Sequence, residues 1–141
     1  MTPRILGLDV GRRRIGVAVS DELGLTAQAL TFVENTGDED VIAALADLVE
    51  RYGVGRIVIG LPKRTDGTLG PEAEYVLAFG RRLAEGLGVP VEFWDERFST
   101  AEAERLLVSA GMRRSRRRRV VDQVAAALVL QTYLESKRRQ R

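Results

Sequence analysis

Three acidic residues that lie far apart in the chain, Asp9, Glu96 and Asp122, occupy positions where an acid has little structural use. Asp9 directly follows the apolar run at residues 5–8, so its charge falls at the end of a predicted buried strand. An isolated ionised carboxylate in an apolar interior costs many kcal/mol, and buried acids are therefore normally paired or bound to a metal. The position of Asp9 predicts a cation close to it.

The amino-acid composition limits which cation and which chemistry are available. The 141 residues include no cysteine and no histidine, which excludes disulfides, thiolate metal sites and imidazole as a base, nucleophile or ligand. A metal ion would have to be a hard cation held by carboxylates, such as Mg²⁺ or Mn²⁺. With 45% hydrophobic residues the chain can bury one good core, so we expect a single domain over residues 1–141.

The net charge of +2 hides an uneven distribution along the chain. Residues 1–111 carry 12 basic and 18 acidic side chains, whereas residues 112–141 carry 10 basic and 2 acidic ones. Such a basic end is typical of a polyanionic partner, although a solvated, frayed terminus explains residues 137–141 equally well. The basic run at 113–119 favours the first interpretation, because it lies between two predicted helices and close to Asp122.

The sequence shows no sign of export or membrane insertion. Residues 1–20 lack a signal-peptide pattern, because their apolar stretches are short and are interrupted by Arg12, Arg13 and Arg14. No apolar run approaches the length of a membrane span. We therefore expect a cytoplasmic protein with no membrane partner.

The hydrophobic periodicity predicts an α/β fold. Apolar runs at 5–10, 15–20 and 25–34, joined by tight turns, indicate an antiparallel meander of three strands. Further along the chain the pattern predicts a helix at 41–52, a strand at 56–61, a helix at 71–87, a strand at 89–94, a helix at 99–111 and a last helix at 120–137. Helical crossovers would place the last two strands beside the meander, giving a mixed five-stranded sheet covered by helices, in the order β-β-β-α-β-α-β-α-α.

Ligand sites of α/β sheets form at the carboxyl ends of the parallel strands. Three segments fall at that edge in the predicted fold, residues 9–11, the loop at 62–70 and residues 94–97, and we expect them to converge. Asp9 shares a strand face with Ile5 and Gly7, because side chains alternate along a strand. A strand-end acid that caps a turn is the structural alternative for Asp9.

The last helix is predicted to bring Asp122 toward the same edge. Asp122 lies on one helical stripe with Ala125, Ala126 and Val129, which is otherwise small and apolar and should face the sheet. The alanines would allow a close approach, so Asp122 would point toward Asp9 from the first turn of the helix. An acid stabilised by the macrodipole at a helix start is the alternative explanation.

The chain contains the segments Leu8-Asp9-Val10-Gly11, Arg14-Ile15-Gly16-Val17-Ala18, Ser20-Asp21, Gly60-Leu61-Pro62, Asp66-Gly67, Trp94-Asp95-Glu96-Arg97-Phe98-Ser99-Thr100, and Asp122 followed by Ala125-Ala126. Together these segments resemble the YqgF family, also called the RuvX family, of the RNase H-like superfamily, whose members are known as pre-16S rRNA nucleases. The resemblance spans nearly the whole chain, and its acid-containing segment near residue 96 makes it specific. One difference is that arginines stand in the basic segment where the family usually has a lysine, so the charge is kept.

The resemblance implies an RNase H-like fold and a metal-dependent nuclease that processes the 5′ end of pre-16S rRNA in ribosome biogenesis. Asp9, Glu96 and Asp122 would be its catalytic residues and its Mg²⁺ or Mn²⁺ ligands, with Asp9 bridging two ions and the other two acids each completing one coordination shell. Glu96 competes with Asp95, since strand alternation sends the two to opposite sides, and the family places its acid at Glu96.

The same resemblance, together with charge, indicates the residues that contact nucleic acid. Gly11 would let the substrate backbone approach. Arg97 could either bind phosphate or hold Glu96 in a salt bridge. Trp94 could stack on a base, but its place at a strand end beside Phe93 favours a role in the core. The remaining candidates for phosphate contacts are Lys63, Arg64, Arg116, Arg117, Arg118 and Arg119.

Other functions remain open at this point. The nearest alternative substrate is branched DNA, which would make the protein a Holliday junction resolvase in recombination and repair. A noncatalytic module that binds RNA or takes part in transcription could keep the fold, although all three acids are present. An ATPase or sugar kinase could share the Asp-x-Gly motif after a strand, but those folds duplicate the unit that this chain holds once. The partner is therefore structured RNA, possibly as a ribosomal particle, or branched DNA, and the protein is a monomer or a dimer.

Overall fold

The computed structural model of the chain describes residues 3–64, 66–95, 105, 108, 111 and 114–139, and for residues 114–119 it describes the backbone only. Most of the third predicted helix, at 99–111, lies outside the described residues. The elements are β1 (Arg4–Val10), β2 (Arg14–Ser20), β3 (Ala27–Glu34), α1 (Asp38–Tyr52), β4 (Val54–Leu61), α2 (Pro71–Leu87), β5 (Val91–Asp95) and α4 (Arg114–Arg139).

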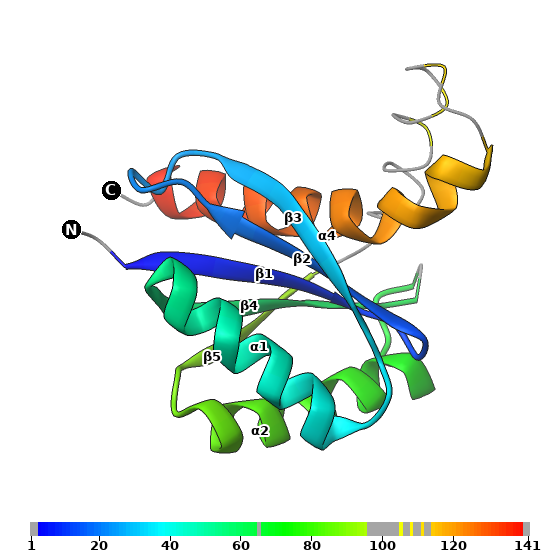
Figure 1. Cartoon of the computed structure of the whole chain (residues 1–141). Helices are drawn as coiled ribbons and strands as arrows, with labels where there is room; N and C mark the ends of the chain where they lie inside the picture. Colours follow the sequence, from blue (N-terminus) through cyan, green and yellow to red (C-terminus); the bar gives the residue numbers. More distant parts are fainter. Residues whose placement is uncertain are drawn as a thin grey trace.

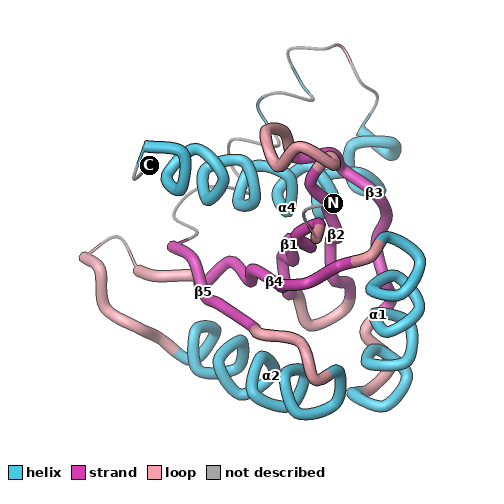
Figure 2. The backbone as a smooth tube through the Cα atoms, turned by 90° about the vertical axis from the view of Figure 1, so that its left-hand side faces the viewer, coloured by secondary structure: helices cyan, strands magenta, loops and turns pink. Residues whose placement is uncertain are grey.

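The strands form one mixed sheet in the order β3-β2-β1-β4-β5. β1 pairs antiparallel with β2, and β2 with β3, as the meander predicts. β1 and β4 are parallel, and so are β4 and β5. In Figure 1 the helix α4 covers one face of the sheet, and α1 and α2 cover the other, and Figure 2 shows the same layers from the side. The predicted mixed five-stranded α/β fold is confirmed.

The two faces of the sheet carry hydrophobic clusters of different extent. The face toward α1 and α2 holds the larger core, in which aliphatic residues such as Leu6, Leu8 and Ile59 are fully buried. These bulky, often β-branched residues suit a pleated surface that is buried on one side. The face toward α4 contains the smaller cluster, including Ala18, Val58 and Ala126.

Glycines in β1 and β2 let α4 come close to the sheet. A Cβ atom added at Gly7 would lie 2.8 Å from the Cβ of Leu130, and one added at Gly16 would overlap the carbonyl oxygen of Asp122. The helix presents its own small residues at this contact, with Ala125 and Ala126 fully buried. The predicted stripe of α4 therefore faces the sheet, at a distance that only glycine permits at residue 16.

The last helix begins at Arg114, whereas the sequence pattern predicted a start at residue 120. Residues 114–119 of the basic run are thus the first turns of α4. Hydrophobic periodicity could not mark these turns because they contain no apolar residue before Val120, yet arginine has a high helix propensity. Asp122 lies two turns inside the helix and not in its first turn, so the macrodipole does not explain the acid at this position.

Other element boundaries differ from the prediction by one to three residues, among them those of β3 and β5. β3 begins at Ala27 because residues 21–26 form a turn, in which Leu25 and Thr26 donate their backbone N–H groups to Asp21 Oδ1 at 2.7 and 3.1 Å. β5 covers Val91–Asp95, one to two residues later than predicted, and starts after Pro90, which has no N–H group for a strand ladder. Among the described helices, none is long and apolar enough to cross a membrane.

We expect Gly16→Ala to destabilise the fold, because its methyl group would force α4 away from β2. Overpacking of this kind typically costs about 1–3 kcal/mol, and the midpoint of urea unfolding measures it. Gly86→Ala in α2 is the matched control, because its Cβ would meet no backbone atom and would lie 3.0 Å from Cγ2 of Ile42. A helical alanine should be neutral or slightly stabilising there. Equal midpoints for wild type and Gly16→Ala would contradict the close packing described for α4.

Candidate functional site

Asp9 lies near the carboxyl end of β1, on the side of the sheet that α4 covers. In the antiparallel pair of β1 and β2 it stands directly opposite Gly16. Opposed residues of such a pair project to the same face, and the face of Gly16 is the one that contacts α4. Gly7, two residues before Asp9, faces α4 in the same way. Asp9 is partly buried, at the edge where the sheet, the β1–β2 turn and α4 meet.

Asp122 lies at the same edge and belongs to α4, the helix that packs on this face of the sheet. Its main chain rests on Gly16, and a Cβ added to that glycine would lie 3.0 Å from the Cβ of Asp122. The side chain of Asp122 is 22% exposed, and one of its oxygens, Oδ2, lies 3.1 Å from Nε of Arg14. The structure thus brings together Asp9, Asp122 and Arg14, although 113 positions separate the two acids in the sequence.

The two acids interact electrostatically. The pKa of Asp122 is raised, first by the burial of the carboxyl group and second by the negative charge of Asp9, while the charge and hydrogen bond of Arg14 act in the opposite direction. Arg14 therefore compensates only part of the negative charge. A second cation between the acids would relieve the rest, since opposite charges within a few ångströms favour the ionised form.

The donors at this edge fit a hard divalent cation. They are carboxylate oxygens, which Mg²⁺ and Mn²⁺ prefer, and the chain has no histidine or cysteine to favour a softer metal. The described part of the chain contains no group of three or more acidic side chains arranged to hold a metal ion. Glu96, the third predicted ligand, lies outside the described residues.

Asp95 lies on the other side of the sheet from Asp9. In β5, Val91 and Phe93 pack against the core under α1 and α2, whereas Trp94 packs against the α4 cluster. By alternation Asp95 belongs to the α1–α2 side, where its Oδ2 lies 3.8 Å from Nζ of Lys63. Asp95 therefore belongs to the opposite face of the sheet from Asp9. This position favours the prediction that Glu96, and not Asp95, is the metal ligand of this segment.

The loop after β4 lies at the same edge, as predicted. Its Lys63 reaches the end of β5 through the ion pair with Asp95. The guanidinium group of Arg64 lies over Gly70, the residue before α2, where an added Cβ would be 2.8 Å from Nε of Arg64. Asp66 closes the loop by accepting hydrogen bonds from the N–H and the hydroxyl group of Thr68, at 2.9 and 2.7 Å. Both residues lie in the loop at the carboxyl edge of the sheet, and their contacts with phosphate stay a prediction.

The structure describes the other predicted nucleic-acid contacts only in part. Arg97 lies outside the described residues. Residues 116–119 form the first turns of α4 in the backbone, one turn before Asp122, and their side chains also lie outside the described part. A Cβ at Gly11 would meet the carbonyl oxygen of Arg14 at 2.7 Å, so the turn itself explains this glycine, and its role toward nucleic acid stays a prediction.

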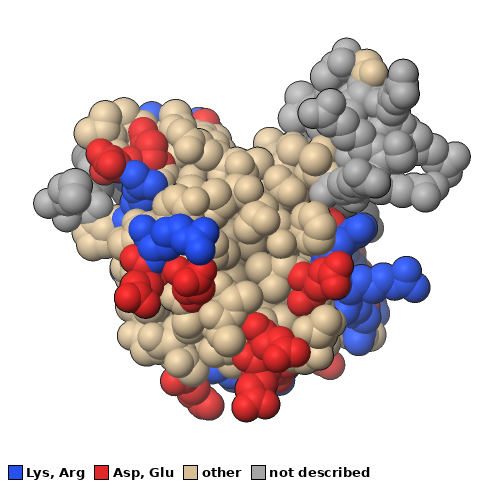
Figure 3. Space-filling model, viewed as in Figure 1, with Lys and Arg blue, Asp and Glu red and all other residues tan. Residues whose placement is uncertain are grey.

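The β1–β2 turn is braced against α2. Arg12 forms an ion pair with Glu72 at 3.2 Å and stacks over the ring of Tyr75, with 4.5 Å between the guanidinium carbon and the ring centroid. Asn35 donates to the carbonyl oxygen of Gly11 at 3.0 Å, which fixes the turn from the end of β3. Figure 3 shows the Lys and Arg side chains that gather over this turn, on the right of the view. These contacts hold the end of β1, and with it Asp9, in place.

Arg14 is the site residue that the sequence interpretation missed. The signal for it was present, because a tight antiparallel turn after Asp9 places residues 14 and 16 on the same face of the neighbouring strand. The sequence pattern assigned no role at the site to the arginines at 12, 13 and 14. Trp94 has the predicted core role, since its Nε1 donates to Oγ1 of Thr132 at 2.9 Å and its ring meets Tyr133 edge-on.

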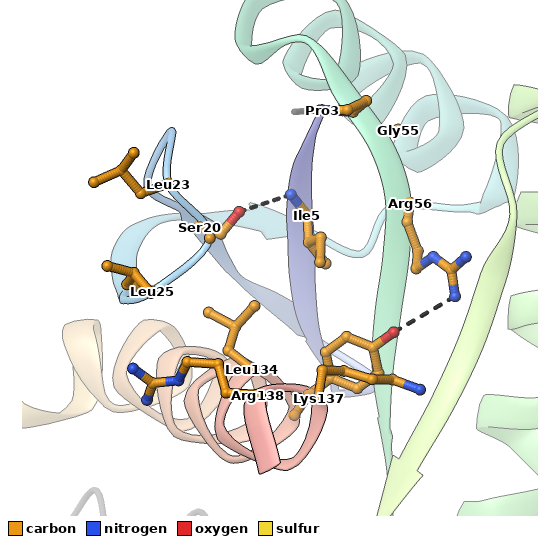
Figure 4. A pocket seen from close by; sticks show the side chains of 12 residues that line it. Pro3, Ile5, Ser20, Leu23, Leu25, Gly55, Arg56, Leu134, Lys137 and Arg138 are labelled. Atoms are coloured by element: carbon orange, nitrogen blue, oxygen red, sulfur yellow. Dashed lines mark hydrogen bonds between the residues drawn. The ribbon is translucent and has the colours of Figure 1, made fainter. Parts of the chain in front are cut away.

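A groove at the opposite end of the sheet has a different chemistry (Figure 4). It is lined by residues from the start of β1 and β4, from the β2–β3 turn and from the end of α4, including Ile5, Leu25 and Tyr133. The nearby carboxylate of Glu92 accepts hydrogen bonds from the hydroxyl group of Tyr133 at 2.6 Å and from Arg56 at 2.9 Å. These partners satisfy the acid, so the groove does not offer the uncompensated charge found at Asp9 and Asp122.

Solved structures with the same architecture define the class of fold. The fowlpox virus resolvase, solved with Holliday junction DNA, has a TM-score of 0.61 at 14% identity, over 95% of this chain and 98% of the resolvase. RuvC of Thermus thermophilus, solved with a Holliday junction substrate, has a TM-score of 0.58 at 17% identity, over 97% and 96% of the two chains. The fold is therefore the RNase H-like fold of these resolvases, as the sequence predicted.

The sequence comparison defines the family. The family model described as "RuvX: Holliday junction resolvase" matches residues 3–136. A relative from Symbiobacterium thermophilum, named "Putative pre-16S rRNA nuclease", is 53% identical over 134 residues, which cover 95% of this chain and 93% of the relative. This chain belongs to the RuvX family, and the resemblance found in its motifs is confirmed.

The network around Glu92 predicts a pH dependence of stability. The hydrogen bond from Tyr133 and, after it, the one from Arg56 lower the pKa of Glu92 despite its partial burial. Because the folded-state pKa is lowered, this stabilisation is present above the unfolded-state pKa of about 4.3 and is lost as the pH falls through the folded-state value. Glu92→Gln should lower the free energy of unfolding by about 1 kcal/mol at pH 7.

Urea unfolding at pH 7 and at pH 3 checks this expectation. The difference between wild type and Glu92→Gln should shrink at the lower pH, because protonation removes the charge that the hydrogen bonds stabilise. Glu85→Gln, at an exposed position of α2, is the matched control and should differ little from wild type at pH 7. A difference for Glu92→Gln that is equal at the two pH values would show that its carboxylate charge does not stabilise the fold.

Proposed function

We propose that this chain is a divalent-metal-dependent nuclease that hydrolyses phosphodiester bonds in structured RNA, with the 5′ end of pre-16S rRNA as its substrate. The observation that carries the proposal is the pair of acids, Asp9 and Asp122, whose negative charge is only partly compensated at the carboxyl edge of the sheet. Membership of a nuclease family supports it, and so does the name of the relative from Symbiobacterium thermophilum.

In this proposal Asp9, Glu96 and Asp122 hold the Mg²⁺ or Mn²⁺ ions. Divalent ions held by carboxylates neutralise charge on the scissile phosphate, activate water and stabilise the leaving oxygen. The protein needs no side chain as general base, which suits a chain without histidine. Its own contribution is to fix the carboxylates, through the strand position of Asp9 and the rigid contact of Asp122 with Gly16.

Basic residues at the same edge would hold the nucleic acid. Lys63 and Arg64 lie in the loop after β4, and residues 116–119 open the helix that carries Asp122. In our proposal they contact phosphates on either side of the acids, with Gly11 and Arg97 closer to the scissile bond. Such contacts position the backbone and carry no base specificity.

A Holliday junction is the second candidate substrate, because the family is described by that activity. RNA and branched DNA offer the same phosphates to the acids, so the two substrates differ in shape and not in the chemistry of cleavage. The proposal places the enzyme in the cytoplasm, where ribosomal precursors of bacteria mature. Cleavage assays with both substrates under identical conditions decide between them.

Asp122→Asn tests the catalytic part of the proposal. The change keeps the side-chain volume and removes one negative ligand, so the fold should survive while cleavage of a pre-16S rRNA fragment in Mg²⁺ or Mn²⁺ falls by about 10²-fold or more. RNA affinity measured in Ca²⁺ should hardly change. Full activity of Asp122→Asn would remove this residue from the site. Intact RNA binding without cleavage of any RNA or junction by the wild type would favour a noncatalytic binding module.

A melting experiment tests the metal site independently of cleavage. Binding of Mn²⁺ to the folded state should raise the melting temperature of the wild type as the concentration of Mn²⁺ increases. Asp9→Asn should lose most of this response, because one of the two close carboxylates is gone. Asp47→Asn is the matched control, since Asp47 pairs with Arg51 on the surface of α1, and it should respond as the wild type does. Identical responses of wild type and Asp9→Asn would contradict a shared metal site.

A further inference from the structure

We propose that Arg14 is a positioning residue with two alternative partners, Asp122 when no divalent ion is bound and a phosphate of the nucleic acid when one is. The inference rests on the proposed function, because it assumes a cation between Asp9 and Asp122. In this role Arg14 controls how readily the cation binds, and it links the binding of the cation to the binding of nucleic acid.

The first contact is explicit in the structure. Arg14 is the first residue of β2, and its Nε lies 3.1 Å from Oδ2 of Asp122 on α4. The guanidinium carbon also lies 6.0 Å from the ring centroid of Phe32 on β3. Arg14 thus joins β2, β3 and α4 at the edge that holds Asp9.

This contact opposes the binding of a metal ion for two reasons. The guanidinium group occupies a carboxylate oxygen of Asp122 that a divalent ion would coordinate, and its positive charge repels the ion. The pair is also replaceable, since the side chain of Arg14 is 40% exposed and ion pairs at such exposure contribute only about 0–1 kcal/mol. A divalent ion at the acids can therefore displace Arg14 at a modest cost.

The released guanidinium would remain at the site, because the strand position of residue 14 fixes where the side chain starts. A guanidinium group presents a planar fork of donors that matches phosphate, and it stays charged at all relevant pH values. The nearest ligand of this kind would be the substrate backbone that the divalent ions attract. Arg14 would then exchange the carboxylate of Asp122 for a phosphate oxygen.

Arg12, two residues earlier in the same turn, provides a matched comparison. It carries the same charge, but its partners are Glu72 and the ring of Tyr75 on α2, and neither of these is a predicted metal ligand. A metal ion at Asp9 and Asp122 has no reason to displace it. Arg12→Gln therefore controls for the loss of one positive charge from the β1–β2 turn.

The first experiment measures Mn²⁺ binding without nucleic acid, from the electron paramagnetic resonance signal of free Mn²⁺. Arg14→Gln should bind Mn²⁺ about three- to fivefold more tightly than the wild type, the factor that corresponds to an exposed ion pair. Arg14→Lys keeps the charge and should stay close to the wild type, and so should Arg12→Gln. A purely structural role of Arg14 predicts the reverse, because a loosened Asp122 would bind Mn²⁺ more weakly.

The second experiment measures the affinity of a fluorescent RNA hairpin in saturating Ca²⁺. Arg14→Gln should bind the hairpin more weakly, and the slope of log affinity against log salt should become flatter by about 0.7–0.9, the share of one phosphate contact. Tighter Mn²⁺ binding combined with weaker RNA binding is the signature of the proposed exchange. An unchanged salt slope would overturn the phosphate contact.

The outcomes separate this inference from the proposed function. If the wild type binds no Mn²⁺ that Asp9→Asn abolishes, the metal site itself is wrong. If that binding is present but Arg14→Gln leaves it unchanged or weaker, the site stands and the inference about Arg14 is overturned. Circular dichroism melting of each variant in EDTA verifies that the measured proteins are folded.

Discussion

The site depends on one steric constraint, the contact between the main chain of α4 and Gly16. Nothing larger than a hydrogen atom fits at residue 16, because a Cβ there would overlap the carbonyl oxygen of Asp122. The same glycine stands opposite Asp9, so one missing side chain sets both the depth of the helix and its distance from the first acid. The other small residues of this face, Gly7 and Ala18 among them, extend the flat surface on which α4 lies. The relative position of the two acids is therefore a result of packing.

Two acidic side chains at opposite ends of the sheet, Glu92 and Asp122, differ in how completely their charge is compensated. At one end, Glu92 receives hydrogen bonds from Tyr133 and Arg56, and its lowered pKa indicates an acid that stabilises the fold. At the other end, burial and the charge of Asp9 raise the pKa of Asp122, although Arg14 is in contact with it. Proteins usually avoid such unbalanced charge, and they keep it where a ligand supplies the missing partner.

Much of this arrangement could be predicted from the sequence because it follows from periodicity. Alternation along β1 gave the face of Asp9, and helical spacing placed Asp122 on a stripe with Ala125 and Ala126, both of which are buried. The start of α4 could not be predicted in this way, since its arginines bury nothing and only their helix propensity indicates a helix. The partnership of Arg14 with Asp122 depends on the packing of α4 against β2, a contact between distant segments that a local pattern does not contain. Asp95 and Glu96 are neighbours of the same type, and only the side chains around β5 show which face Asp95 takes.

The position of Asp122 in α4 also matters while the protein is being made. The polypeptide leaves the ribosome from its N-terminus, and domains are completed in that order. All five strands and Asp9 precede α4 in the chain, so the sheet can emerge before the helix that closes the acidic edge. A nascent chain without α4 contains Asp9 but not Asp122, and no helix covers Gly7 and Gly16. The two acids of this edge therefore come together only after α4 has been synthesised.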